Sequence, residues 1–144
     1  MQDYRRLKVW EKAHAFALGV HRTSERFPRR AGSVIAGQLR RASLSIPANI
    51  AEGAAKGSDA EFRRFLHIAM GSALEADYHL LIARDTGLLS RAVHDELSSQ
   101  DLEIRRMLGG LIKRLTECIG DRVPRPSPSA SSDVLAKPSE RRTE

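Results

Sequence analysis

The sequence predicts an all-α protein, an antiparallel up-down-up-down four-helix bundle with a kinked second helix and a disordered C-terminal tail. Apolar residues recur at spacings of three and four over four long segments, which is the period of amphipathic helices. No stretch of useful length shows the strict alternation that is typical of a strand. The segments between the helices are short, as they are in bundles whose consecutive helices run antiparallel.

The first expected helix covers residues 7–27. Pro28 ends it, because the residue before a proline is pushed out of the α region. The second expected helix covers about residues 33–53. The largest side chains expected to anchor the core of the bundle are Trp10, Phe62 and Phe65.

Residues 38–53, QLRRASLSIPANIAEG, lie at the centre of this prediction. One face of this stretch carries apolar or small residues at helical spacing, namely Leu39, Ala42, Ile46, Ile50 and Gly53. Pro47 lies inside the pattern, where it removes a backbone donor and crowds the carbonyl of Ser43, so we expect a kink. Asn49 falls within the apolar face, where a polar amide typically fixes register or oligomeric state.

Capping signals delimit the third and fourth helices. Ser58 and Glu61 form the S-x-x-E signature that begins the third helix. Gly87 allows this helix to end, because glycine adopts the left-handed conformation of a C-terminal cap. Ser90 is the expected N-cap of the fourth helix, which extends to about Ile119.

The chain is expected to form one domain, because 144 residues with 41% hydrophobic content suffice for a single core. Residues 1–120 form the expected bundle. Residues 121–144 are rich in proline and serine, contain four of the six prolines and show no periodicity. This composition predicts a disordered tail.

Positive charge is concentrated in the first part of the chain. Residues 1–56 hold 11 Lys or Arg against 4 acids, whereas residues 57–120 hold 8 against 10. Such asymmetry favours an anionic partner, above all a nucleic acid. The candidate phosphate-binding residues are Arg5, Arg6, Lys8, Lys12, Arg29, Arg30, Arg40 and Arg41. The alternative is that these residues only keep the bundle soluble, since no sequence-reading motif accompanies them.

The second and third helices each carry a further apolar stripe, offset from the core face. A monomer would expose these stripes as patches of the kind that normally mark an interface, so we expect a homo-oligomer. The candidate interface residues are Gly37, Leu44, Ala48, Ala51, Met70, Leu74 and Leu81.

Catalytic, metal and cofactor chemistry finds little support in the sequence. A metal site in a bundle calls for two E-x-x-H pairs, and Glu11 with His14 is the one case. The segment GAAKGS at 53–58 has the letters of a phosphate loop in the wrong order and follows no strand. Cys118 is the only cysteine and lies on an apolar stripe, so we expect a small core side chain. We therefore expect a non-enzymatic protein without cofactor or metal.

Location is predicted from the same composition. No run approaches the eighteen or so apolar residues of a membrane span, and the N-terminus MQDYRRLKVW has no apolar signal core. A single cysteine allows no internal disulfide, which is typical of a reducing compartment. We expect a soluble, cytoplasmic protein.

Three stretches resemble a known family: LKVWEKA at 7–13, QLRRASLSIPANIAEG at 38–53 and EFRRFLHIAMGSALEADYHLLIARDTGLLS at 61–90. They are similar to the bacterial 23S rRNA intervening-sequence proteins, or S23-type proteins, over about residues 4–119. The resemblance implies a left-handed antiparallel bundle that assembles into a ring-like homopentamer, with no assigned catalytic residues. Some relatives of this fold are accessory variability determinant proteins of diversity-generating retroelements, which bind nucleic acid and a reverse transcriptase.

Two functions follow from these observations. The first is a non-enzymatic homo-oligomer that binds nucleic acid, with RNA favoured over DNA, through the basic surface of the first two helices. The second is a protein-binding scaffold or accessory subunit, for example a reverse-transcriptase partner, in which the charge is incidental. Salt dependence separates the two, because phosphate contacts weaken steeply as salt rises.

Overall fold

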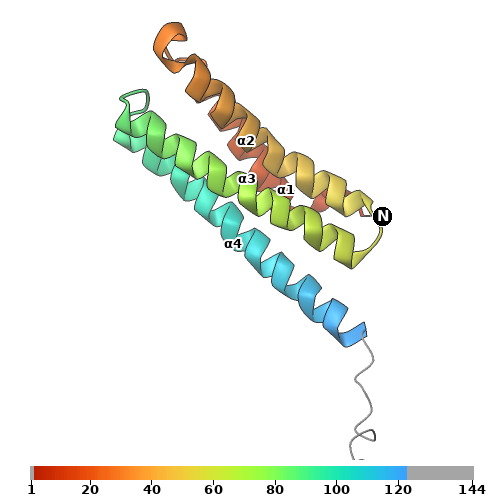
Figure 1. Ribbon diagram of the computed structural model, residues 1–144. Coiled ribbons are helices and arrows are strands. Elements are labelled where there is room, and N and C mark those ends of the chain that lie inside the picture. The colour runs from red at the N-terminus through yellow and green to blue at the C-terminus, as the bar shows by residue number, and fades with distance from the viewer. Residues whose placement is uncertain (1, 123–144) are drawn as a thin grey trace, which may run out of the picture.

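The computed structural model describes residues 2–122, and within them the chain is an all-α four-helix bundle (Figure 1). A short 3₁₀ helix precedes four α-helices: η1 (Tyr4–Arg6), α1 (Lys8–Ser24), α2 (Arg29–Ala55), α3 (Asp59–Asp85) and α4 (Arg91–Arg122). Figure 1 shows α2, α3 and α4 side by side with alternating direction, and α1 behind them. The predicted fold class is confirmed. Helix α4 continues to Arg122, two residues past the expected end of the bundle at residue 120, and the rest of the predicted tail lies outside the described residues.

The predicted helix caps form. The Ser58 hydroxyl oxygen accepts the backbone N–H of Glu61 at 3.2 Å, and the Ser90 hydroxyl oxygen accepts that of Val93 at 3.2 Å. Gly87 follows α3 with a φ of +79°, the left-handed conformation that favours glycine. The local signals therefore place the α2–α3 and α3–α4 connections where the sequence predicts them.

The α1–α2 connection is shorter than expected. Helix α1 ends at Ser24, and α2 begins at Arg29, directly after Pro28. A proline suits this position, because the first residues of a helix need no backbone donor. Helix α2 continues through the buried Pro47 to Ala55. The kink at Pro47 stays a prediction.

The core lies between all four helices. Its largest fully buried apolar side chains are Phe16, Val20, Leu39, Ile46, Ile50, Leu66, Leu80, Ile104 and Leu108. Phe62 and Phe65 are buried, as expected. Trp10 packs at the edge of the core and is only half-buried, with its ring between those of Tyr4 and His14.

Cys118 is exposed, so its expected place in the core is wrong. The apolar stripe of α4 passes through Leu108, Leu111 and Leu115 and continues four residues later at the half-buried Ile119. Cys118 also fits the helical period, seven residues after Leu111, but of the two neighbours only Ile119 is half-buried. The packing at this end of α4 therefore leaves the thiol exposed.

Asn49 lies at the edge of the apolar face, where α2 meets α3. Its amide nitrogen donates to the backbone oxygen of Ser45 at 2.8 Å and to the Ser45 hydroxyl at 3.0 Å. The Ser45 hydroxyl is also 2.8 Å from that of Ser72 on α3. The amide thus has partners inside its own chain and supports the pairing of α2 with α3. A part in oligomer choice stays a prediction.

Candidate nucleic-acid interface

The eight candidate basic residues do not form one surface. The group at the start of the chain contains Arg5, Arg6, Lys8 and Lys12, and the group on α2 contains Arg29, Arg30, Arg40 and Arg41. The start of the chain lies beside the end of α2, because the backbone N–H of Gln2 donates to the oxygen of Ala54 at 3.1 Å. Arg29 and Arg30 begin α2, whose 27 residues span about 40 Å at 1.5 Å per residue. The structure therefore places Arg5 and Arg6 at the opposite end of the bundle from Arg29 and Arg30, with Arg40 and Arg41 near the middle of α2.

Local partners occupy part of the first group. The ammonium of Lys12 pairs with a carboxylate oxygen of Glu103 at 3.5 Å. The guanidinium of Arg5 lies 5.1 Å from the ring centroid of Tyr4. Both interactions are weak, and only the ion pair of Lys12 offsets a positive charge, whereas the contact of Arg5 with Tyr4 leaves its charge in place.

Arg40 and Arg41 point to different sides of α2. The Nε of Arg40 donates to the Ser24 hydroxyl on α1 at 2.6 Å, so this half-buried side chain belongs to the α1 side. The Nη2 of Arg41 donates to the Gln38 side-chain oxygen at 2.8 Å. Arg41 is exposed and lies at helical spacing from Leu44, in the outward stripe of α2. The two neighbouring arginines are therefore available to different partners.

Arg22 lies in the last turn of α1 and Arg26 in the α1–α2 connection, close to Arg29 and Arg30 in the chain, although neither is among the residues expected at a basic surface. We call these four residues the arginine end. All four are exposed, and within residues 2–122 none forms an ion pair. Four arginines within nine consecutive residues, 22–30, were a visible signal of this cluster in the sequence.

Acidic residues do little to neutralise the arginine end. Glu25 is the only acid between residues 22 and 30. Its carboxylate lies 3.4 Å from the ring of His21, one turn earlier on the same helix. The cluster therefore keeps a net positive charge that a polyanion can meet.

Two hollows flank the arginine end. One, of about 270 Å³, lies between α1 and the α3–α4 connection and is lined by Arg22, Arg26 and Leu89 among others. The other is a groove of about 490 Å³ between the end of α1 and the start of α2, with Arg29 and Arg40 in its walls. We call the second the Arg40 groove. Arginine side chains therefore line the two hollows as well as the open surface of the arginine end.

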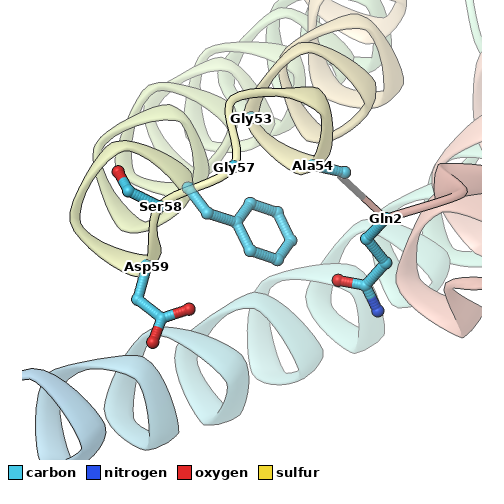
Figure 2. Close-up of a pocket in the computed structure, with 7 residues that line it drawn as sticks. Gln2, Gly53, Ala54, Gly57, Ser58 and Asp59 are labelled. Atoms are coloured by element: carbon cyan, nitrogen blue, oxygen red, sulfur yellow. The ribbon is translucent and has the colours of Figure 1, made fainter.

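A third hollow, of about 200 Å³, lies at the opposite end of the bundle and offers no free charge (Figure 2). Asp59 is the one charged residue in its lining, and its carboxylate pairs with Arg122 at 3.0 Å. Figure 2 shows the Gln2 side chain on one side of the hollow and Asp59 on the other. The GAAKGS segment here forms the end of α2 and a turn, and no strand precedes it.

A buried carboxylate lies between α3 and α4, away from these surfaces. Asp101 has no exposed surface, and its Oδ1 accepts from the Nε of Arg105 at 2.7 Å. Its Oδ2 has no hydrogen-bond partner. Arg105 also approaches Asp77 at 3.7 Å, and Asp77 accepts from the Ser98 hydroxyl at 2.7 Å.

Burial raises the pKa of Asp101 to about 6, because desolvation disfavours the charged form more than Arg105 favours it. Its position was readable from the sequence, since Leu97, Asp101, Ile104 and Leu108 continue one stripe at spacings of four, three and four. A side chain with no exposed surface contacts no substrate in this conformation. Asp101 therefore affects the stability of the fold. Within residues 2–122, no cluster of three or more His, Cys, Asp or Glu side chains is arranged to hold a metal ion.

The candidate oligomer-interface residues occupy two separate surfaces. On α2, Gly37, Leu44 and Ala48 are exposed and Ala51 is half-buried. On α3, Leu74 is exposed, whereas Met70 and Leu81 are half-buried. Met70 packs against the core of its own chain, so part of this stripe already has a partner. Two large apolar residues that extend these stripes, Val34 and Tyr78, are also exposed, by 75% and 58%.

None of the helices in the described part of the chain is long and apolar enough to cross a membrane.

The family models and the solved structures both include matches to this chain. The sequence profile of a family described as 23S rRNA-intervening sequence protein matches residues 5–110, which reach from η1 into α4. The fold resembles a crystal structure described as a protein with unknown function from the S23 ribosomal protein family of Bacteroides thetaiotaomicron VPI-5482. The two chains share 29% sequence identity with a TM-score of 0.68, over 73% of this chain and 98% of that one. A comparison with curated proteins finds no match.

Proposed function

Because the chain belongs to the 23S rRNA-intervening sequence protein family, we propose that it is a homo-oligomeric helical bundle that binds RNA through the arginine end. The observation that carries this proposal is the cluster Arg22, Arg26, Arg29 and Arg30, whose members are exposed and form no ion pair in the described part of the chain. The basic surface proposed here is therefore one end of α1 and α2, and not their whole length.

Elementary electrostatics supports a nucleic acid as the partner. Arginine presents a planar fork of N–H donors that matches the oxygens of a phosphate. Each phosphate that such a residue neutralises releases condensed counterions, so several exposed arginines give affinity without reading sequence. The arginine end therefore has the composition for contacts with the phosphate backbone.

Oligomerisation is part of the proposal, since the outward stripes of α2 and α3 differ from each other. A contact between two different patches is heterologous, and such contacts generate closed rings when the rotation between subunits closes. The ring-like homopentamer implied by the family resemblance is of this type. In a ring, equivalent arginine ends would face a long polyanion at several points and raise the affinity by avidity.

The test is a charge reversal at the arginine end, Arg29→Glu with Arg30→Glu. We expect the unmodified chain to bind an unstructured oligoribonucleotide, with affinity that falls steeply between low and physiological salt. The double variant should lose at least about tenfold in affinity while its thermal unfolding changes little, because exposed charges contribute little to stability. Fluorescence anisotropy at several salt concentrations measures the affinity and its salt dependence, and circular dichroism on heating measures the unfolding.

The matched control is the same reversal at the other end of the bundle, Arg5→Glu with Arg6→Glu. It alters net charge equally but leaves the arginine end intact, so a much smaller loss is expected. Equal losses in the two double variants would show that only net charge matters. No loss in either variant, or no salt dependence, would remove RNA binding from the proposal.

A protein-binding scaffold is the second candidate function. The observation that favours it is exposed apolar surface, including Val34, Leu44 and Leu74 on the outward stripes. If oligomerisation leaves these side chains uncovered, another protein is the natural occupant. Binding of this type would depend weakly on salt, which separates it from the first proposal.

A further inference from the structure

The Arg40 groove is built differently from the open arginine end, although it adjoins it. It lies between the last turn of α1 and the first turns of α2, with a volume of about 490 Å³. Its walls include Ser24, Arg29, Gly32, Ser33 and Arg40. Gly32 lets the α1–α2 connection pack closely against α2 here, since a Cβ at this position would lie 2.7 Å from the Cβ of Phe27.

Arg40 is held in one position by a buried hydroxyl. Ser24 is only 3% exposed, and its hydroxyl donates to the backbone oxygen of His21 at 3.1 Å. With its hydrogen engaged there, the same oxygen accepts from the Nε of Arg40 at 2.6 Å. This bond uses one edge of the guanidinium and leaves the N–H donors of both Nη atoms for other partners. The side chain is therefore preorganised as well as charged.

The charge on Arg40 has no counterion within residues 2–122. It is half-buried, and none of the ion pairs of the described chain includes it. Glu25 also lines the groove, but its carboxylate lies against the ring of His21. A partly desolvated cation is costly unless an anion or water satisfies it.

We propose that the Arg40 groove is a phosphate-binding site in which the Nη donors of Arg40 hold a phosphate group, and Arg29, three turns earlier on α2, adds positive charge to the groove wall. One guanidinium group can offer forked N–H donors to the oxygens of a phosphate. The phosphate can come from two sources. One is the backbone of a bound RNA strand, and for this source the proposal rests on the RNA-binding function. The other source is a free phosphorylated ligand, and the experiment separates them.

The first test changes Arg40→Lys, which keeps the charge and removes the fork and the bond to Ser24. Binding is measured with two probes, inorganic pyrophosphate by calorimetry and an oligouridylate by anisotropy. We expect about a tenfold loss for pyrophosphate, which is the loss of roughly one charge-assisted hydrogen bond. The control is Arg106→Lys, an equal change at an exposed arginine of α4, for which no loss is expected.

The second test asks whether Ser24 acts through Arg40. Ser24→Ala leaves every charge in place and frees the guanidinium, so pyrophosphate affinity should fall while the salt dependence of binding stays the same. In the Arg40→Lys background the same change should have no further effect. If the two losses simply add, Ser24 is not positioning Arg40.

Because Ser24 is buried, Ser24→Ala can lower the stability of the fold as well as binding. A third variant therefore tests the groove at an exposed position. Ser33→Glu adds a carboxylate at an exposed position of the groove wall, one turn from Arg29 and two turns from Arg40. It should occupy the arginines and abolish pyrophosphate binding without lowering the unfolding temperature. Unchanged binding in this variant would overturn the proposal.

The outcomes separate the groove from the wider function. A loss of affinity for both probes supports a binding site for a phosphate of RNA. A loss of affinity for pyrophosphate alone supports a site for a free phosphorylated ligand. If oligouridylate binding depends on Arg29 and Arg30 but neither probe responds to Arg40→Lys, the groove proposal fails and RNA binding stands. If pyrophosphate binds through Arg40 and no RNA binds, RNA binding fails and the groove stands.

Discussion

Asp101 shows how one residue can oppose the stability of the bundle that contains it. Its carboxyl group is fully buried, one oxygen has no hydrogen-bond partner, and its pKa is raised from 3.8 to about 6 by desolvation. Arg105 and Asp77 are the charged groups beside it. At neutral pH the folded chain must therefore bury a charge that water would solvate better in the unfolded chain.

The sign of the pH effect follows from this raised pKa. Between about pH 4 and pH 6 the folded chain holds a proton on Asp101 that the unfolded chain has released. The free energy of unfolding therefore falls as pH rises through this range and levels off above it. Asp101→Asn removes the ionisation while its side-chain oxygen can still accept from Arg105, so this fall should disappear.

Relative to the unmodified chain, Asp101→Asn should gain up to about 3 kcal/mol in free energy of unfolding from pH 4 to pH 7.5, since one pKa unit corresponds to about 1.4 kcal/mol. Urea unfolding at several pH values measures it. Glu96→Gln, an exposed change on the same helix, is the control and should leave the pH profile as it is. A parallel profile for Asp101→Asn would mean that this carboxyl does not titrate as proposed.

At the scale of elements, small residues decide how closely α2 and α3 pack. The core face of α3 contains Ala69, Ala73 and Ala76, all without exposed surface. Gly53 of α2 lies so close to α3 that a Cβ there would be 2.7 Å from the Cβ of Phe65. The hydroxyls of Ser45 and Ser72 meet at 2.8 Å between the same two helices. Close approach of the helices therefore depends on positions that tolerate no added volume.

Gly53→Ala and Gly71→Ala should have opposite effects on stability. Alanine favours a helix over glycine by about 1 kcal/mol, and a Cβ at Gly71 meets no atom within 4 Å, so Gly71→Ala should stabilise by about that amount. At Gly53 the clash with Phe65 should outweigh this gain and destabilise by about 1 to 3 kcal/mol. Chemical denaturation of both variants measures the contrast. Stabilisation by both changes would show that Gly53 of α2 and Phe65 of α3 are not in close contact.

At the scale of the whole molecule, the outward stripes are the apolar surface that a monomer leaves open. Leu44 on α2 and Leu74 on α3 are exposed by 56% and 52%. Arg41 lies within the α2 stripe and is bonded to Gln38 of its own chain. Arg41 is therefore placed to take part in assembly, whereas Arg40 faces the groove on the α1 side.

Light scattering tests the assembly. The chain has a mass of 16.0 kDa, and we expect a mass near five times this value at micromolar concentration. Leu44→Glu or Leu74→Glu should dissociate the assembly, because each buries an unpaired charge in the interface. Leu18→Glu is the control, since this leucine is 40% exposed on α1, outside both stripes. A mass near one chain for the unmodified protein would remove the homo-oligomer from the proposal.

The sequence by itself determined the helices and most of their limits. Ser58, Ser90 and Gly87 act through their own turn of backbone, so their effect is local and readable from neighbouring residues. The same holds for the core positions that recur every three or four residues, with Phe62 and Phe65 among them. It does not hold for Cys118, where two adjacent positions fit the period and only packing distinguishes them.

Only the tertiary structure decided which charged residues share a surface. Helix length and antiparallel pairing separate Arg5 and Arg6 from Arg29 and Arg30, although all four belong to the basic first part of the chain. The bond of Arg40 to Ser24 joins residues sixteen positions apart, which no helical period relates. Local sequence determines on which side of a helix a residue lies, and the packing of the helices determines what it meets there.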